Sequence, residues 1–307
     1  MKTLFVSLAA LVGAAAVVCS PATAQAPAGG GQPGQADHGT AQQMRPKISC
    51  TRQSLQAAVD SYLAAQKAGD HSKMAFAEKV KYLENMSEVA PDKGMWNTQL
   101  PVDFSRSFLD KDRCRTFTEV ISTTGATQYV IGTRLTVDNG KITAIDSLMS
   151  KKGDWLFNAN AYLKYSSKED WSAPAKGPSR TSMQTLINAA NSYLDLFSDK
   201  YETIPWGRPC ARLEGGAYTN RNGDPNSTCE VGIPGGVLYI VNRDYVVDEE
   251  QGVINVFCRF GDSKTGMPDS HTFRVIDGKL RNVHTISVNL TPGRPSPQAD
   301  DNGNIIR

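Results

Sequence analysis

Basic runs and histidine are both scarce in this chain. Four of its 307 residues are histidine, and the formal net charge is only +2, with both signs mixed along the whole sequence. Proteins that bind nucleic acid usually gather Lys and Arg in one run or on one face. The sequence therefore predicts no nucleic-acid partner.

Long apolar runs are missing after the first 24 residues. Lys2 precedes an apolar segment at 4–18 and a small-residue cleavage pattern at 22–24, an order that is typical of a secretory signal peptide. The apolar segment is too short for a membrane span, and no later segment is apolar enough for one. We therefore expect a signal peptide at 1–24, no membrane partner, and a secreted protein that is extracellular, or periplasmic if the host is bacterial.

Cysteine is scarce as well, and the number of cysteines left for disulfide formation is odd. Six cysteines occur, and the first lies in the expected signal peptide. The other five would reach an oxidising compartment, where disulfides form. Spacing alone leaves the connectivity open. The simplest pairing joins Cys50 to Cys114 and Cys210 to Cys229, and leaves Cys258 free and buried in a strand.

Known signatures of covalent catalysis are absent. The sequence shows no Ser-His-Asp or Cys-His nucleophile motif, and Gly215-Gly216 is too short a glycine run for a phosphate loop. We therefore expect no organic cofactor and no resident metal. These absences leave open whether the chain is an enzyme.

What the sequence does contain is a helix followed by strands, found twice. Residues 54–69 and 182–197 carry apolar side chains at helical spacing. Runs of β-branched residues follow each helix, and the turn signals Asn139-Gly140 and Asp277-Gly278 each join two of the expected strands. Two further short helices are expected, at 73–84 and 104–110.

Two alignments indicate that this pattern is an internal duplication. The motif Asp-Ser-Tyr-Leu at 60–63 matches Asn-Ser-Tyr-Leu at 191–194 with an offset of 131 residues, and the two turn signals match with an offset of 138. Nearly equal offsets at separate anchors predict tandem domains. The expected division is a signal peptide at 1–24, a flexible linker rich in Ala, Gly, Pro and Gln at 25–47, a first domain at 48–167, an interdomain linker at 168–180, a second domain at 181–291 and a disordered tail at 292–307.

The chain resembles a fungal secreted family of unknown function built from two nuclear transport factor 2-like (NTF2-like, or SnoaL-like) domains. The resemblance covers roughly 50–288 and is carried by the segments YLENMSEV, CRTFTEV, YVIGTRL, GDWLFNA, YLDLF, IPWGRPCARLEGG, RDYVVD and PDSHTFRV…GK…VHTI. It implies an α+β fold in which helices pack on a curved antiparallel sheet and enclose a cone-shaped pocket. It also implies pairing through the outer face of the sheet, as a homodimer or as a pseudo-dimer of the two repeats. It assigns no reaction, because this fold hosts isomerases, dehydratases, hydrolases and binding modules.

The hairpin at 268–288 holds the main candidate site. If Asp277-Gly278 forms a two-residue type I′ turn, the alternating flanks place His271 opposite His284 on the inward face. Two histidines on one face of a pocket could share the roles of general acid and general base. Asp269, two residues before His271, could orient that imidazole. We therefore predict that these three residues are catalytic.

Other interpretations of this pair stay open. Both histidines could be structural, or could hold zinc together with one carboxylate, and Asp269 could be an ordinary turn residue. A slip of one residue in register would move the side chains to the other face. In the first repeat the same register places Thr133 opposite Asp146, so only the second domain would carry the histidine pair.

Three residues outside the hairpin are candidates for substrate binding. Arg212 and Glu214 share one side of a strand just before Gly215-Gly216, where a backbone or a ligand could approach closely. Arg212 could hold a carboxylate through two hydrogen bonds, and Tyr245 could act as a secondary acid or base. The alternatives are an Arg212–Glu214 ion pair and a surface tyrosine.

Two functions fit these residues. The first is a cofactor-independent lyase, isomerase or hydrolase that acts on a small organic molecule or saccharide by histidine acid–base chemistry. The second is a non-catalytic secreted module that binds a small ligand or a glycan, and a structural protein of the wall or envelope is a third interpretation. An enzyme requires an abnormally titrating histidine in a solvent-reachable cavity, whereas a binding module predicts a closed apolar cavity.

Overall fold

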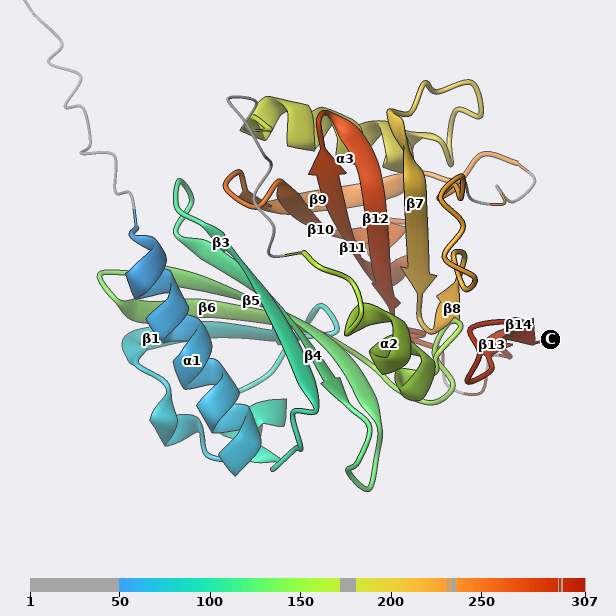
Figure 1. Cartoon of the computed structure of the whole chain (residues 1–307). Coiled ribbons are helices and arrows are strands. Elements are labelled where there is room, and N and C mark those ends of the chain that lie inside the picture. The colour runs from blue at the N-terminus through green and yellow to red at the C-terminus, as the bar shows by residue number, and fades with distance from the viewer. Residues whose placement is uncertain are drawn as a thin grey trace, which may run out of the picture. The chain divides into compact units, whose positions relative to one another are not determined.

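The structure is a computed structural model that describes residues 50–171, 181–230, 232, 236–291, 293 and 295–306. The expected signal peptide, the linker at 25–47 and residues 172–180 of the interdomain linker lie outside these residues. From Arg45 onward the chain forms one structural unit. Its described part contains two six-stranded sheets and three α-helices (Figure 1).

The two sheets have the same topology. Their strand orders are β2-β1-β6-β5-β4-β3 and β8-β7-β12-β11-β10-β9. The β1–β6 and β7–β12 pairs are parallel, and the other pairs in both sheets are antiparallel. The first sheet comprises β1 Phe76–Glu84, β2 Ser87–Glu88, β3 Phe104–Asp110, β4 Arg115–Ser122, β5 Tyr129–Asp138 and β6 Lys141–Ser150. The second comprises β7 Trp206–Glu214, β8 Ala217–Tyr218, β9 Ile240–Asp248, β10 Val253–Phe260, β11 Met267–Ile276 and β12 Lys279–Ser287.

Two expectations about secondary structure are wrong. The segments 73–84 and 104–110, expected to be helical, mostly form β1 and β3. Each sheet is mixed rather than purely antiparallel, and the fold contains more strand than an α+β order implies. The reason is tertiary, because β1 obtains its backbone partners from β6, which lies more than 50 residues further along the chain.

One long helix covers the inner face of each sheet. Helix α1 Arg52–Ala68 shares a buried cluster with the first sheet, and α3 Met183–Asp195 shares one with the second. Thr51 and Ser182 cap these helices by accepting hydrogen bonds from backbone N–H groups three residues on. Gly69 ends α1 at a φ of 64°, where a Cβ atom would lie 2.6 Å from the backbone nitrogen of Gln99. The remaining helices are α2 Ala159–Ser166 and the 3-10 turns His71–Lys73, Pro91–Lys93 and Met95–Asn97.

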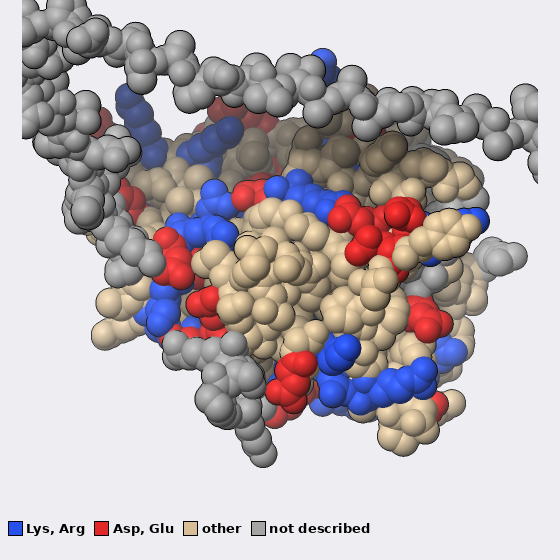
Figure 2. Space-filling model, turned by 90° about the horizontal axis from the view of Figure 1, so that it is seen from above, with Lys and Arg blue, Asp and Glu red and all other residues tan. Residues whose placement is uncertain are grey.

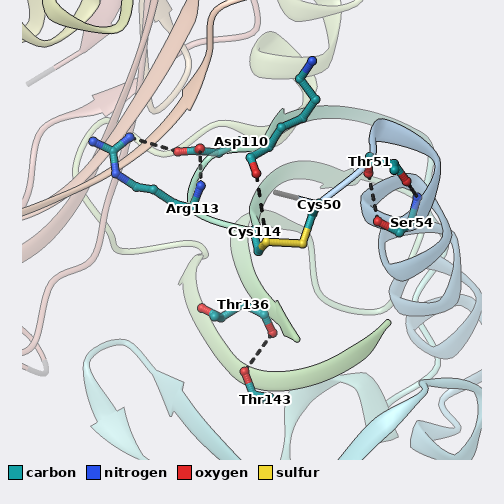
Figure 3. Close-up of a disulfide and its surroundings, with 9 residues drawn as sticks. Cys50, Thr51, Ser54, Asp110, Arg113, Cys114, Thr136 and Thr143 are labelled. Atoms are coloured by element: carbon teal, nitrogen blue, oxygen red, sulfur yellow. Dashed lines mark hydrogen bonds and ion pairs between the residues drawn. A yellow bond between two sulfur atoms is a disulfide. The ribbon is translucent and has the colours of Figure 1, made fainter. Parts of the chain in front are cut away.

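Both predicted disulfides are confirmed. The Cys50–Cys114 bridge ties the start of α1 to the turn between β3 and β4, as Figure 3 shows. The Cys210–Cys229 bridge ties β7 to the loop after β8, and Cys258 is free and buried on β10. Each bridge restricts the unfolded chain and stabilises the fold by about 3 to 4 kcal/mol in the loop-entropy model.

The outer faces of the two sheets pack against each other. Phe117 of β4 and Phe257 of β10 meet edge to face, with ring centroids 6.2 Å apart. They belong to one buried cluster that draws on both repeats, including Phe108, Ile121, Val130 and Leu148 from the first and Val246, Val253, Ile286 and Val288 from the second. Figure 1 shows β3 and β9 running close to each other at this junction.

Two equivalent aspartates fix the junction reciprocally. Asp248 at the end of β9 accepts a hydrogen bond from the Leu109 N–H at 2.9 Å, and Asp110 at the end of β3 accepts one from the Val247 N–H at 2.9 Å. Both carboxylates are buried, with 0% and 1% exposure for Asp110 and Asp248. The same contact made in both directions is the pattern of a twofold interface.

The C-terminal segment is ordered where we expected a disordered tail. Strands β13 Gln298–Ala299 and β14 Ile305–Ile306 form a small hairpin. The Tyr165 hydroxyl of α2 donates to the Asn302 carbonyl at 2.6 Å, and Asn158 Nδ2 donates to the Ala299 carbonyl at 3.1 Å. Polar composition predicted disorder, but these contacts with α2 hold the segment in place.

The surface carries mixed charge. On the face that Figure 2 shows, Lys and Arg lie next to Asp and Glu around an uncharged central area, with no patch of a single sign in the part that is described. Among the helices that the structure describes, none is long and apolar enough to cross a membrane.

We expect Asp248→Ala to lower the free energy of unfolding by about 3 kcal/mol. The substitution removes the acceptor for the Leu109 and Gln251 N–H groups and for the Arg52 guanidinium. Urea denaturation measures the change. Asp60→Ala is the control, because Asp60 is exposed and accepts only from Gln56, so its effect should stay within about 0.5 kcal/mol. An Asp248→Ala protein as stable as this control would contradict the interpretation.

Candidate functional site

A β-bulge places the side chains of the two histidines on opposite faces of the sheet. The type I′ turn forms as expected, with φ of 51° at Asp277 and 69° at Gly278. Beyond Val275–Leu280 the register shifts by one residue, so His271 pairs with Thr285 and Thr272 pairs with His284. The predicted pairing of His271 with His284 is therefore wrong, because one extra residue on β12 moves His284 to the opposite face of the sheet.

The same bulge occurs in the first repeat. The register of β5 and β6 shifts between Thr136 and Val137, so Thr133 pairs with Ser147 instead of the predicted Asp146. The β-bulge is thus part of the duplicated unit. A turn signal fixes the register beside the turn, but a bulge further along leaves no mark in the alternating pattern.

His271 faces the interior of the second repeat. Its ring lies 5.6 Å from Tyr193, 5.8 Å from Phe260 and 5.8 Å from Phe273 by centroid distance. Its Nδ1 lies 3.5 Å from Asp269 Oδ2 and has no hydrogen-bond partner. Asp269 accepts a hydrogen bond from Ser287 Oγ at 3.2 Å. Two of the predicted catalytic residues are therefore adjacent, and the imidazole of one of them is unsatisfied.

Burial keeps this pair uncharged. It lowers the pKa of His271 to about 3, an effect that the charges of Arg212 and Arg243 reinforce. Burial, together with the Glu214 charge, raises the pKa of Asp269 well above its ordinary value. At neutral pH the pair is thus a neutral imidazole beside a carboxyl group whose raised pKa favours its protonated form.

Arg212 and Glu214 lie at the edge of this interior. Their side chains form an ion pair at 3.3 Å and are 16% and 22% exposed. Arg212 also interacts electrostatically with the buried Tyr193. The ion-pair interpretation is confirmed. Gly215 and Gly216 pack against the backbone at 155–158, within about 3 Å of where a Cβ would stand, so a protein segment rather than a ligand accounts for that close approach.

Tyr245 does not join the centre. Its hydroxyl donates to Asn191 Oδ1 at 2.9 Å, and Arg243 Nη1 donates to the same oxygen at 3.0 Å. These contacts tie β9 to α3 on the sheet edge. The expected role of Tyr245 as a secondary acid or base therefore has no geometric support among the contacts described.

His284 lies at the junction of the repeats, between two carboxylates. Its Nδ1 is 3.1 Å from Glu119 Oε2 and its Nε2 is 2.6 Å from Glu169 Oε2. Tyr162 and Ser166 donate to Glu119, at 2.8 and 2.9 Å. Every polar atom of this imidazole has a partner, which is the pattern of a structural ion network.

These acidic partners could not be found from the sequence. Glu119 comes from β4 of the first repeat and Glu169 from the segment after α2, and both are more than 110 residues away from His284. Trp171 and Tyr218 donate to Glu169, at 2.8 and 2.9 Å. Only the packing of the two repeats brings the five side chains together.

The interior of the first repeat has the same topology but different side chains at the equivalent positions. With the hairpin offset of 138, His271 corresponds to Thr133, Asp269 to Ile131, and Cys258 to Val120. Thr133 Oγ1 is hydrogen-bonded to the buried Tyr62 hydroxyl at 2.8 Å. The unsatisfied histidine and the buried acid are therefore properties of the second repeat only.

One cluster has donor atoms suited to a transition metal. The sulfur of Cys258, an Asp269 oxygen and a His271 nitrogen all lie within 4.8 Å of one another, and the three residues are buried. A thiolate, a carboxylate and an imidazole are ligands that Zn²⁺ accepts. The zinc set considered from the sequence, with both histidines, is wrong because His284 lies on the other face of the sheet.

Comparison with known proteins assigns only the second repeat. Residues 179–287 match the model of a domain of unknown function (DUF8021), which is about a third of the chain. No curated protein matches. Six solved chains match. AclR from Streptomyces galilaeus is 13% identical, with a TM-score of 0.26 over 33% of this chain and 91% of the other. An NTF-2 like protein of unknown function from Burkholderia xenovorans is 10% identical, with a TM-score of 0.24 over 36% and 89%. Likenesses this weak do not carry an argument about function.

We expect His284 to make the stability of the protein fall at alkaline pH. Its two carboxylate neighbours outweigh the effect of burial and raise its pKa from 6.5 to about 9 in the folded state. The stabilisation is therefore complete below pH 6.5 and is lost as the pH rises through about 9, with a total on the order of 3 kcal/mol. Urea midpoints measured from pH 6.5 to 9.5 test this slope.

His284→Gln should remove most of that slope, although it also lowers stability at every pH. His271→Gln is the matched control, because the pKa of His271 is lowered to about 3 and its ring stays neutral in this window. A wild-type slope that survives in His284→Gln would contradict the assignment.

Proposed function

We propose that the protein is a secreted enzyme of the lyase, isomerase or hydrolase type that acts on a small organic molecule or saccharide. The proposed site is the interior of the second repeat around His271, which is buried in this structure and would have to open to admit a substrate. The observation that carries the proposal is the buried His271 Nδ1, which has no hydrogen-bond partner and lies 3.5 Å from Asp269. Unsatisfied buried groups are costly, so they persist where they have a use.

The pair supplies a base and an acid side by side. In a lyase reaction, neutral His271 removes a proton from a substrate carbon while protonated Asp269 donates its proton to the departing oxygen. The C–H and C–O bonds break, a C=C bond forms, and water leaves. His271 then returns its proton to Asp269 across the 3.5 Å between them. Each proton transfer of this kind increases the reaction rate by about 10²- to 10⁴-fold.

Arg212 is placed to hold the substrate. Its side chain is partly exposed, interacts electrostatically with the buried Tyr193, and forms an ion pair with Glu214. A substrate carboxylate could replace Glu214 as the partner of this guanidinium. In this proposal the Arg212–Glu214 ion pair closes the site when it is empty and opens when an acidic substrate arrives.

The two repeats act as an internal pseudo-dimer in this proposal. The outer face of each sheet, through which NTF2-like domains pair, is already covered by the other repeat. The reciprocal hydrogen bonds of Asp110 and Asp248 support the same arrangement. A homodimer through these faces is then not required, and the first repeat serves as a scaffold for the second.

The test is a ligand screen followed by an assay of turnover. Uronate-containing oligosaccharides and small phenolics are screened by thermal shift, and those that raise Tm are followed for the ultraviolet absorbance of a new C=C bond. His271→Gln and Asp269→Asn should each lower kcat/KM by about 10²- to 10⁴-fold, with KM little changed. Full turnover by His271→Gln would sink the proposal, and binding without turnover by the wild type would favour a binding module.

The duplication provides a matched pair of controls. Tyr193 and Tyr62 occupy equivalent positions on α3 and α1. Tyr193→Phe removes the hydroxyl group that interacts with Arg212 and should weaken substrate binding, whereas Tyr62→Phe removes only the bond to Thr133. Equal effects of the two substitutions on KM would show that the second repeat has no special role.

A metal centre is the second candidate, favoured by the spacing of Cys258, Asp269 and His271. If this centre holds a divalent ion, a cobalt titration should saturate at one equivalent and give a thiolate-to-cobalt charge-transfer band, with release of protons from the ligands. Cys258→Ser should abolish the band. His284→Gln, on the other face of the sheet, should keep it. A titration without any band would leave the metal-free mechanism as the only candidate for this centre.

A further inference from the structure

An arginine and an aspartate that face each other across two strands do not form an ion pair. Arg134 of β5 is directly opposite Asp146 of β6 in the register. Opposite charges at such positions normally approach each other. Here Arg134 Nη1 instead donates to Asp244 Oδ2 of β9 at 3.2 Å, and Asp146 Oδ1 has no hydrogen-bond partner. The second repeat thus draws the guanidinium away from its cross-strand neighbour.

One edge of the Arg134 guanidinium, formed by Nε and Nη2, remains unpaired. The side chain is only 6% exposed, and its plane lies over the Phe257 ring at 4.6 Å. Its Nε and Nη2 have no hydrogen-bond partner. These two N–H groups point in parallel and form the fork that matches the two oxygens of a carboxylate. Leaving both donors buried and unpaired is costly.

The two residues that carry these unpaired groups, Arg134 and Asp146, line a small cavity at the junction of the repeats. It has a volume of about 150 Å³, and both Arg134 and Asp146 line it together with Lys81, Arg115 and Asp244. A water molecule takes about 30 Å³ in the liquid, so the space could hold about five waters or a small organic molecule. The lining carries one more positive charge than negative charge, which favours a ligand with a single negative charge.

We propose that this cavity binds a small hydroxycarboxylate. On binding, the guanidinium of Arg134 turns its Nε and Nη2 toward the carboxylate, with Lys81 and Arg115 adding positive charge around it. A hydroxyl group next to the carboxylate donates to Asp146 Oδ1. This site is separate from the interior of the second repeat and does not depend on the function proposed for it. The ligand could be a free hydroxy acid or the uronate residue of a saccharide, since both carry this chemistry.

Nitrogen–proton correlation spectra of the purified protein test the proposal directly. The Arg134 Nε–H signal is assigned by its loss in Arg134→Lys. D-Glycerate represents a free hydroxy acid and D-glucuronate a sugar acid, with glycerol and glucose as neutral molecules of matched skeleton. We expect a saturable shift of the Arg134 signal with one or both acids and none with the neutral pair. A response to glucuronate alone would identify the saccharide source.

Calorimetry on variants gives an independent test. Arg134→Lys keeps the charge but loses the fork, and affinity should fall at least tenfold. Lys81→Gln changes an exposed side chain that should not affect folding, and affinity should fall about two- to fivefold. Arg259→Lys is the matched control, because Arg259 is also a buried strand arginine, 9% exposed, but donates to the Gly266 carbonyl in the second repeat. His271→Gln should bind like the wild type.

Three outcomes would overturn the proposal. No saturable shift with either acid at millimolar concentration would mean that the cavity holds only water. Equal shifts with the neutral molecules would mean that the carboxylate is not recognised. Undiminished affinity in Arg134→Lys would show that the acid binds elsewhere.

Discussion

The packing of one sheet's outer face on the other is the contact on which the rest of this structure depends. Asp110 and Asp248 each accept a backbone hydrogen bond from the opposite repeat, and both are buried. Between them lies a cluster to which both repeats contribute. Because each sheet uses its outer face in this contact, each inner face is left to its own helix. The contact also creates the buried charge cluster around His284 and the partly exposed one around Arg134 and Asp244, which no single repeat could form.

Hydrogen-bond satisfaction separates the roles of these buried groups. His284 has a carboxylate on each ring nitrogen, so its charge is stabilised and its role is structural. His271 is equally buried, but its Nδ1 has no partner and burial keeps the ring neutral. Arg134 is satisfied only in part, because its Nη1 has a partner whereas its Nε and Nη2 have none. Buried polar groups without partners are costly, so His271 and Arg134 are the residues on which the two proposals rest, whereas His284 contributes to stability.

The two repeats share one fold but differ in the polarity of their interiors. Both repeats have the same strand order, the same bulge and the same tyrosine on the long helix. In the first, Tyr62 bonds to Thr133. In the second, the equivalent tyrosine interacts electrostatically with Arg212, and a histidine and an acid replace the threonine and an isoleucine. The scaffold is conserved between the copies, whereas the polarity of the interior is not.

The sequence by itself determined the elements whose signals are local. The two type I′ turns, the two long helices and the duplication were predictable, since each rests on residues a few positions apart, and the disulfide pairing was the simplest of several. Tertiary structure decided what depends on distant partners: β1 and β3 became strands by pairing with neighbours, and contacts with α2 ordered the C-terminal hairpin. It also decided the candidate site. A single bulged residue on β12 sent His284 to the opposite face from His271, where carboxylates from other parts of the chain bind it. Strand periodicity carries no record of a bulge, because the extra residue shifts register without changing the alternation on either side.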